Sequence, residues 1–147
     1  MSIILAALAD TVTETASKVP ESELDAMYGV GYHLFSEGHH LDAGRIFALL
    51  AYYRPKEPRY LEATALACMK LNDHCQAIHL FARALEVVPE RLDLALLLAD
   101  CMLRNGNRET ALVVLAGIAG HARELGDAQA EERATGMLEL LTPPVPA

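Results

Sequence analysis

The 147-residue sequence contains few of the patterns on which catalysis or ion binding depends. It has no glycine-rich phosphate loop, no Gly-x-Ser-x-Gly nucleophile motif and no His-Glu-x-x-His metal motif. Its few serines share no recognisable frame with a histidine, and its six histidines show no spacing typical of a ligand set. We therefore expect no catalytic residue, no bound metal and no cofactor.

Cysteine is scarce as well, and the three thiols show no Cys-x-x-Cys pair: Cys68, Cys75 and Cys101. An odd count without a pairing framework is typical of reduced thiols in a cytoplasmic protein. Cys68 and Cys101 are expected to be small buried apolar residues, whereas Cys75 stands at a predicted helix start and should be more exposed.

Long apolar runs and positive charge are also lacking. The N-terminal run MSIILAALAD has no basic residue before it, and the first one in the chain is Lys18, so we expect no secretory signal. The run at 94–103 is too short to cross a bilayer and contains Asp100. With 12 Lys and Arg against 20 Asp and Glu, the net charge is −8. This balance argues against nucleic acid and stable membrane association.

What the sequence does contain is a regular register in which one residue pattern occurs three times. Small residues recur at a fixed spacing, a large apolar residue follows each of them four positions later, and a proline follows in two of the three copies. These positions are Ala43, Ala77 and Ala111, then Phe47, Phe81 and Leu115, then Pro55, Pro89 and, in the third copy, Arg123. The spacing and the pattern are typical of tetratricopeptide repeats, in which each unit is a helix hairpin that stacks on the next.

The predicted fold is all-α, with three tetratricopeptide hairpins that form a concave α-solenoid and an extra helix at each end. The expected divisions are an N-terminal helix in 1–19, a repeat domain in 20–141 with repeats at about 24–57, 58–91 and 92–125, a C-terminal helix at 127–141 and a disordered tail at 142–147. No segment has the alternating pattern of a strand.

Turn and cap residues mark the expected helix ends. Pro20 or Ser22 is expected to start the first helix of repeat one, and Ser22 and Asp25 resemble a capping box with the shorter acid. Gly38 and Asn72 tolerate the left-handed conformation that ends a helix. Asp73 is expected to cap the helix that follows Asn72.

Tyr28, Tyr32 and Phe35 form a stripe on the first helix of repeat one, at i, i+4 and i+7. This stripe is expected to be separate from the one that packs the hairpin. Tyrosine has a large apolar body and a polar tip, which suits a pocket for a bound peptide. The alternative is that the three rings pack on the N-terminal helix.

The corresponding offsets in the next two repeats extend this candidate peptide-binding site. They are Glu62, Leu66, Met69 and Lys70 in repeat two, and Leu96, Asp100 and Leu103 in repeat three. Such a groove is apolar along its floor with a few charges, which favours an extended hydrophobic peptide. It has too few Lys, Arg and Asn residues for a carboxylate clamp.

The chain resembles the class II chaperones of bacterial type III secretion systems, which escort hydrophobic translocator proteins. The resemblance covers residues 20–141 and depends on LDAMYGVGYHLFSEGHHLDAGRIF in repeat one and PRYLEATALACMKLNDHCQAIHLFARAL in repeat two. It also includes a third repeat without its proline and a final helix that contains MLELL. The resemblance implies that Tyr28, Tyr32 and Phe35 bind a short Pro- and Leu-containing client segment.

The function implied is that of a cytoplasmic chaperone, not an enzyme, that covers a hydrophobic segment of its secreted client. The resemblance also implies a homodimer through the N-terminal helix, although the N-terminal sequence departs from the family. Two alternatives are a generic tetratricopeptide adaptor in a protein complex and a transcriptional co-regulator.

Overall fold

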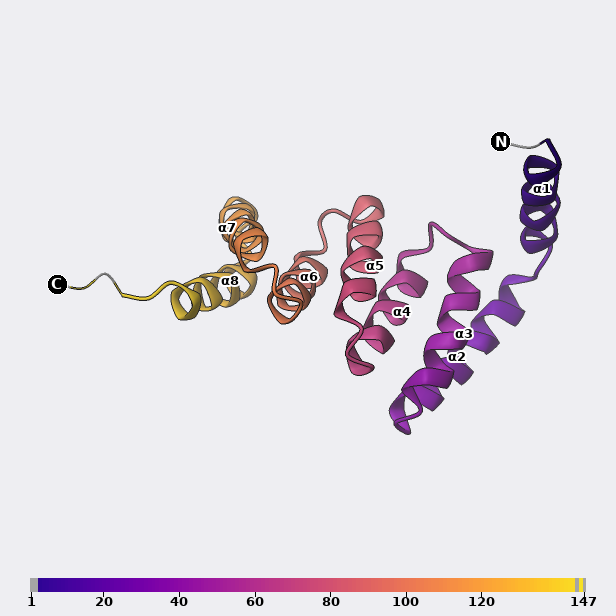
Figure 1. Cartoon of the computed structure of the whole chain (residues 1–147), viewed down its shortest axis with the longest axis horizontal. Coiled ribbons are helices and arrows are strands. Elements are labelled where there is room, and N and C mark those ends of the chain that lie inside the picture. The colour runs from indigo at the N-terminus through magenta and orange to yellow at the C-terminus, as the bar shows by residue number, and fades with distance from the viewer. Residues whose placement is uncertain (1–2, 145, 147) are drawn as a thin grey trace.

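The computed structural model describes residues 3–144 and 146, and every regular element in this part of the chain is an α-helix. The helices are α1 (Ile3–Ser17), α2 (Glu21–Ser36), α3 (His40–Tyr53), α4 (Pro58–Lys70), α5 (His74–Val87), α6 (Leu92–Arg104), α7 (Arg108–Leu125) and α8 (Ala128–Leu141). They follow one another along an elongated array, with α1 and α8 at its opposite ends (Figure 1). The predicted all-α solenoid is confirmed, while residues 145 and 147 of the predicted disordered tail lie outside the described residues.

The three hairpin turns share one backbone geometry. Gly38, Asn72 and Gly106, which occupy the same position of the register, have φ angles of +88°, +60° and +86°. In each turn the next residue donates its N–H to a carbonyl five residues back, as His39 does to Leu34 at 2.8 Å. This is the hydrogen bond of a Schellman motif, and it reverses the chain within a few residues. The repeat register therefore sets the turns as well as the helices.

The helix caps agree with the sequence in one case and differ in another. The Asp73 carboxylate accepts a hydrogen bond from the Gln76 N–H at 3.2 Å, so the predicted cap of α5 is confirmed. The predicted capping box at Ser22 is wrong. Helix α2 begins at Glu21, with Pro20 at the N-cap and no side-chain cap, and Asp25 instead accepts a hydrogen bond from Arg59.

The small and large residues of the register form the contact inside each hairpin. Ala43, Ala77 and Ala111 are completely buried, and the large residues four positions later are at most 1 % exposed. Gly31 shows how close the approach is. A Cβ atom at this position would lie 2.5 Å from the Phe47 ring, so a larger residue would require the ring or the helices to shift.

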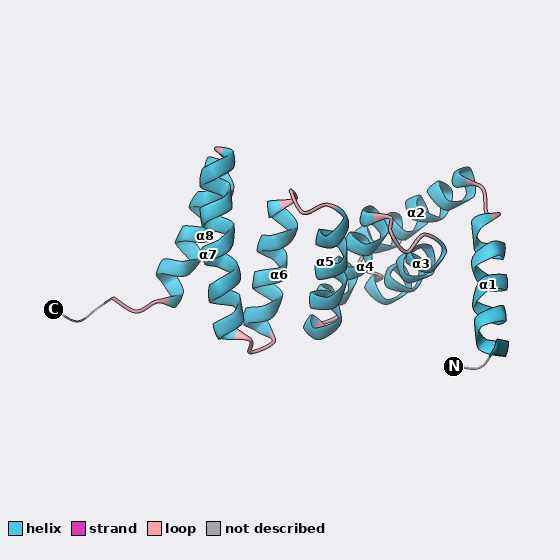
Figure 2. Cartoon of the chain, turned by 90° about the horizontal axis from the view of Figure 1, so that it is seen from above, coloured by secondary structure: helices cyan, strands magenta, loops and turns pink. Residues whose placement is uncertain are grey.

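The core is divided along the array. The largest cluster of buried residues runs from α2 to α6, and a second cluster joins α6, α7 and α8. Helix α1 stands at the N-terminal end and contacts α3 (Figure 2). None of the helices in the described part of the chain combines the length and hydrophobicity that a bilayer crossing requires.

Candidate functional site

Five aromatic side chains meet where α2, α3 and α4 come together. We call them the aromatic cluster: Tyr28, Tyr32, Phe35, Phe47 and Tyr60. The Tyr28 ring centroid lies 4.8 Å from that of Tyr32, 5.9 Å from Phe47 and 5.6 Å from Tyr60. Tyr32 lies 5.2 Å from Phe47 and 6.4 Å from Phe35. These distances are typical of tilted and edge-to-face aromatic pairs.

The cluster has a buried base and an exposed edge. Phe47 and Tyr60 are buried, Tyr28 and Phe35 are half-buried, and Tyr32 is 38 % exposed. Burial is the main cause that raises the pKa of Tyr28, and its hydrogen bond with Tyr32 raises it further. Tyr28 therefore keeps its proton at neutral pH. The exposed edge offers neutral aromatic surface on a firmly packed base.

The expectation that the stripe is separate from the hairpin packing needs correction. Tyr28 and Tyr32 both contact Phe47, which belongs to α3. The reason is Gly31: without a Cβ on α2, the Phe47 ring comes close to the helix backbone and reaches side chains on either side of the glycine. The alternative was that the three rings pack on the N-terminal helix. The described ring contacts do not show this, because the rings that they join lie on α2, α3 and α4.

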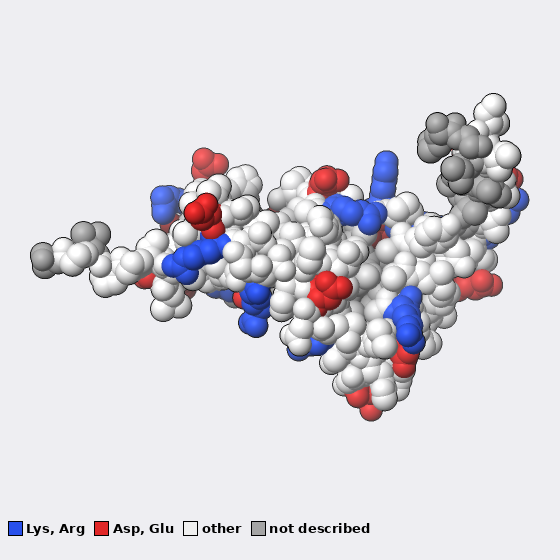
Figure 3. All heavy atoms as spheres, in the orientation of Figure 1, with Lys and Arg blue, Asp and Glu red and all other residues white. Residues whose placement is uncertain are grey.

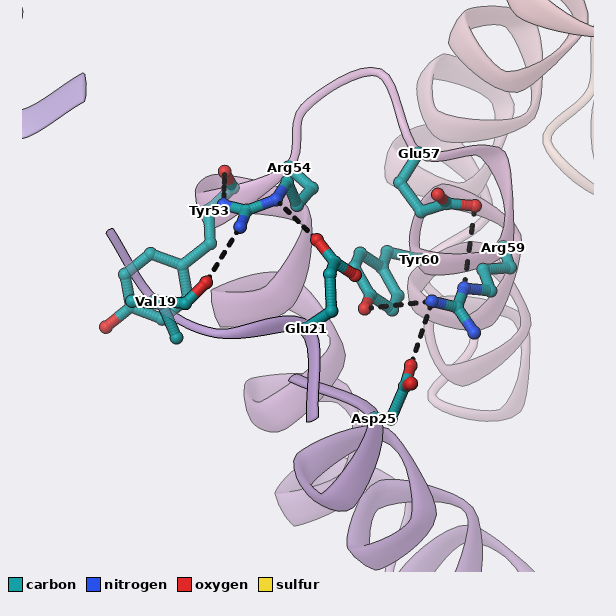
Figure 4. A network of polar contacts seen from close by, with 8 residues as sticks. All are labelled: Val19, Glu21, Asp25, Tyr53, Arg54, Glu57, Arg59 and Tyr60. Atoms are coloured by element: carbon teal, nitrogen blue, oxygen red, sulfur yellow. Dashed lines mark hydrogen bonds and ion pairs between the residues drawn. The ribbon is translucent and has the colours of Figure 1, made fainter. Parts of the chain in front are cut away.

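Arg59, the second residue of α4, covers one side of the aromatic cluster. Its guanidinium carbon lies 5.3 Å from the Tyr28 ring centroid and 5.0 Å from that of Tyr60. Its Nη2 donates to Asp25 Oδ1 at 3.0 Å and to the Tyr60 hydroxyl at 3.3 Å, while its Nε lies 3.5 Å from Glu57 Oε1 (Figure 4). Consecutive first helices, α2 and α4, are thus joined by one arginine.

Arg59 was not among the site residues predicted from the sequence, although the register contained a signal for it. Asp25 and Arg59 are separated by one full repeat and so occupy the same position in consecutive repeats. Because equivalent positions of neighbouring repeats lie side by side in a stack, opposite charges at one position predict an ion pair between repeats.

A second arginine ties the start of α2 to the end of α3. Arg54 Nε donates to Glu21 Oε1 at 3.1 Å, and Arg54 Nη2 donates to the Val19 carbonyl at 2.9 Å (Figure 4). The arginine side chain is 25 % exposed. These contacts hold the segment between α1 and α2 against the first hairpin, beside the aromatic cluster.

The predicted site residues of repeat two lie on α4 and remain partly accessible. Leu66 and Met69 are half-buried and pack against the largest core cluster. Lys70 is exposed, at the end of the helix. Glu62 is half-buried, and its carboxylate lies 3.3 Å from Arg91 Nη2.

The predicted site residues of repeat three, on α6, differ from one another. Leu96 is only 3 % exposed and belongs to the second core cluster, because α7 and α8 close over this part of α6. It is a core residue in this structure. Asp100 accepts a hydrogen bond from Arg104 Nε at 3.0 Å, and Leu103 is half-buried.

A hollow elsewhere on the molecule contains none of the predicted residues. It is an open depression of about 280 Å³ between α5, α6 and α7. Its lining is Cys75, Ile78, His79, Met102, Asn105, Asn107 and Thr110.

In the described part of the chain, no three His, Cys, Asp or Glu residues are grouped so that they could hold a metal ion. All three cysteines are free, and Cys75 is the exposed one. Burial raises the pKa of Cys68 and, to about 11, that of Cys101. Both of these thiols are therefore protonated at neutral pH and unreactive.

Charge is spread thinly over the face that Figure 3 shows. Lysine and arginine side chains stand singly or beside an acidic group, and wide uncharged areas separate them. This face therefore lacks the continuous basic surface that a polyanion requires.

The tetratricopeptide repeat family matches residues 69–132 of the chain. No curated protein sequence matches it. Several solved structures match most of the chain. PcrH in complex with the chaperone binding region of PopD is 21 % identical, with a TM-score of 0.75, and the match covers 84 % of this chain and 94 % of PcrH; PcrH has also been solved from Pseudomonas aeruginosa.

Two further structures have TM-scores in a similar range. A chain of a type III secretion complex from Aeromonas hydrophila is 23 % identical, with a TM-score of 0.78 over 94 % of this chain and 93 % of that chain. The Yersinia enterocolitica type III secretion chaperone SycD, in complex with a peptide of the translocator YopD, is 18 % identical, with a TM-score of 0.70. The match covers 84 % of this chain and 95 % of that chain. Another SycD structure is described as an alternative dimer. The chain therefore has the fold of these type III secretion chaperones, built from tetratricopeptide hairpins.

Proposed function

We propose that this protein is a cytoplasmic chaperone that binds an extended hydrophobic segment of type III secretion translocator proteins. The segment lies on the client-binding surface, which we define as the exposed edge of the aromatic cluster together with the accessible predicted residues of α4 and α6. Those residues are Glu62, Leu66, Met69, Lys70, Asp100 and Leu103.

The observation that carries this proposal is the exposed edge of Tyr28, Tyr32 and Phe35. Tyr32 is 38 % exposed although its neighbours anchor it firmly. Rigid aromatic side chains at a surface provide binding area with little loss of conformational entropy, and they are common hot spots. Solenoids of the same fold, PcrH and SycD, have been solved with segments of PopD and YopD bound.

The chaperone acts by mass action. A chain that later enters a membrane exposes apolar segments in the cytoplasm, where they aggregate. Binding such a segment lowers the concentration of free exposed segment and needs no chemical step. We accordingly propose that the protein is not an enzyme.

The organisation of the chain follows from this proposal. The repeats at about 24–57, 58–91 and 92–125 and the C-terminal helix 127–141 form the binding domain, and segment 1–19 mediates homodimerisation. The exposed Ile3 and Ile4, at 88 % and 71 %, support a role for α1 in contacts between copies. The alternative dimer of SycD offers a precedent for self-association of this fold.

The proposal is tested by capture from the native bacterium. A tagged chain is purified from cells, and the bound proteins are identified by mass spectrometry, with Tyr32→Ala as the matched control. We expect a hydrophobic secreted protein to co-purify with the wild-type chain and to be depleted with the variant. Capture of a folded partner at equal yield by both chains would support an adaptor instead.

A further inference from the structure

Arg59 lies beside the exposed edge of the aromatic cluster, where a bound segment would pass. Its side chain is 42 % exposed, so it is accessible from solvent. It is nevertheless held in place, because its guanidinium packs on Tyr28 and Tyr60 and bonds to Asp25. An accessible but ordered donor loses little conformational entropy when it binds a partner.

The guanidinium keeps part of its hydrogen-bonding capacity unused. Its polar contacts with described residues involve Nη2, which bonds Asp25 and Tyr60, and Nε, which lies near Glu57. Among these residues Nη1 has no acceptor. Arginine has five N–H donors, so two remain for a bound chain.

An extended segment on this surface needs such a donor. A peptide without secondary structure exposes its carbonyl groups, and each carbonyl that is buried without a partner costs free energy. Leu66, Met69 and Phe35 offer no donor. A fixed arginine at the edge of an apolar surface supplies one, without the need for a particular client side chain.

The charges around Arg59 decide which acceptor it prefers. Two carboxylates, those of Asp25 and Glu57, already lie within 3.5 Å of one guanidinium. Their combined charge exceeds that of the arginine, and the whole chain has a net charge of −8. A further carboxylate is therefore repelled, whereas an uncharged carbonyl is accepted.

We propose that Arg59 is the polar anchor of the client-binding surface. It donates a hydrogen bond from Nη1 to a main-chain carbonyl of the bound segment, and Asp25 and Glu57 select against segments with Asp or Glu at that point. This inference rests on the proposed function, and it adds the chemistry of the partner: an extended apolar segment that is uncharged where it passes Arg59.

The test uses the full-length chain and short overlapping peptides from the co-purified client. The probe is the fluorescein-labelled peptide that binds the wild-type chain most tightly, measured by anisotropy. Arg59→Lys keeps the charge but loses the planar fork. Arg45→Lys is the matched control, because Arg45 also pairs with an aspartate, Asp42 at 3.3 Å, but lies on α3 outside the client-binding surface. We expect Arg59→Lys to weaken binding about tenfold and Arg45→Lys to leave it unchanged.

A second measurement separates direct donation from support of the aromatic cluster. Single backbone amides of the probe are replaced by esters, whose carbonyls accept hydrogen bonds poorly. One ester position should weaken binding to the wild-type chain and have no effect on Arg59→Lys. If every ester lowers the affinity by the same factor for both proteins, Arg59 does not bind a client carbonyl. This conclusion holds even if Arg59→Lys unfolds at a lower temperature than the wild-type chain.

A third measurement addresses selection against acids. At the position the esters identify, Asp in the probe should bind more weakly than Asn, and the difference should shrink in Asp25→Asn. Equal binding of the Asp and Asn probes overturns the selectivity. A wild-type chain that binds no client peptide contradicts the proposed function itself, whereas full binding by Arg59→Lys overturns only the role of Arg59.

Discussion

At the residue scale, the aromatic side chains divide into those that hold the hairpins and those that remain accessible. Phe47 and Phe81 are buried at equivalent positions of the register, as predicted, whereas Tyr32 keeps an exposed edge. Truncation of the two kinds should therefore have different consequences, one for stability and one for binding.

We expect Tyr32→Ala to lose affinity for a client while the protein stays folded. A hot-spot aromatic contributes ~2 kcal/mol or more, which corresponds to a loss of tens-fold in affinity. Phe81→Ala, the control, should lower the free energy of unfolding by roughly 3–5 kcal/mol because it leaves a cavity. Thermal melts and a binding titration check both. Equal destabilisation by the two changes would assign Tyr32 to the core.

Glycine positions offer a matched pair of substitutions within helices. Gly31→Ala places a methyl group 2.5 Å from the Phe47 ring and should destabilise the fold by about 1–3 kcal/mol. At Gly117 a new methyl group would meet no atom within 4 Å beyond the adjacent residues and backbone of its own helix, so Gly117→Ala should stabilise α7 by about 1 kcal/mol, because alanine favours a helix. Denaturant titrations measure both values, and a stable Gly31→Ala would refute the close approach of α2 and α3.

The cysteines should differ in reactivity with pH. Cys75 is exposed, so iodoacetamide should modify it first in the native protein at neutral pH. Cys101 is buried and its pKa is raised to about 11, so its thiolate fraction is small until the pH nears that value. Mass spectrometry of the labelled peptides at several pH values reports the order. Early modification of Cys101 at neutral pH would show that α6 opens readily.

At the element scale, α1 differs from the other helices because none of its described side chains belongs to the core clusters. Arg54 ties the linker after α1 to the first hairpin through the Val19 carbonyl. The position of α1 therefore depends on the linker and on its contact with α3, and its exposed residues remain available for another chain.

Deletion of residues 1–18 should lower the molecular mass measured by light scattering, if α1 joins two copies of the chain. The remaining helices should keep their circular dichroism, because no described residue of the deleted segment belongs to the clusters of the core. An unchanged mass would instead mean that α1 serves only its own chain.

At the scale of the whole molecule, the division of the core sets how the array unfolds. In a solenoid each unit is stabilised mainly by its neighbours, so damage at one end spreads weakly to the other. Here α6 belongs to both large clusters and connects the N-terminal hairpins to α7 and α8.

Leu115→Ala should therefore loosen the C-terminal end selectively. Leu115 is completely buried in the second cluster, and its truncation should cost about 2–5 kcal/mol locally. Hydrogen exchange followed by mass spectrometry should show faster exchange in α7 and α8 than in α2 to α5. A uniform increase over all helices would show that the array unfolds as one unit.

The repeat register was sufficient to predict the architecture. Local preferences act within a few residues, so Gly38, Asn72 and Asp73 marked turns and a cap that the structure contains. The burial of Ala43, Phe47 and Phe81 followed from the same periodicity. The predicted Ser22 cap was wrong because the helix begins at Glu21, directly after Pro20. Pro20 and Ser22 are both start signals, and local chemistry alone cannot rank two signals that lie so close together.

The candidate site was less predictable from the sequence than the architecture, because it depends on contacts between elements. The stripe of Tyr28, Tyr32 and Phe35 was visible in one helix, but its contact with Phe47 required the close packing that Gly31 permits. The burial of Leu96 required α8 to return against α6. Helix periodicity thus determined by itself which residues share a face. Only the tertiary structure decided which faces are covered, because burial depends on the neighbour that packs there and not on the spacing within one helix.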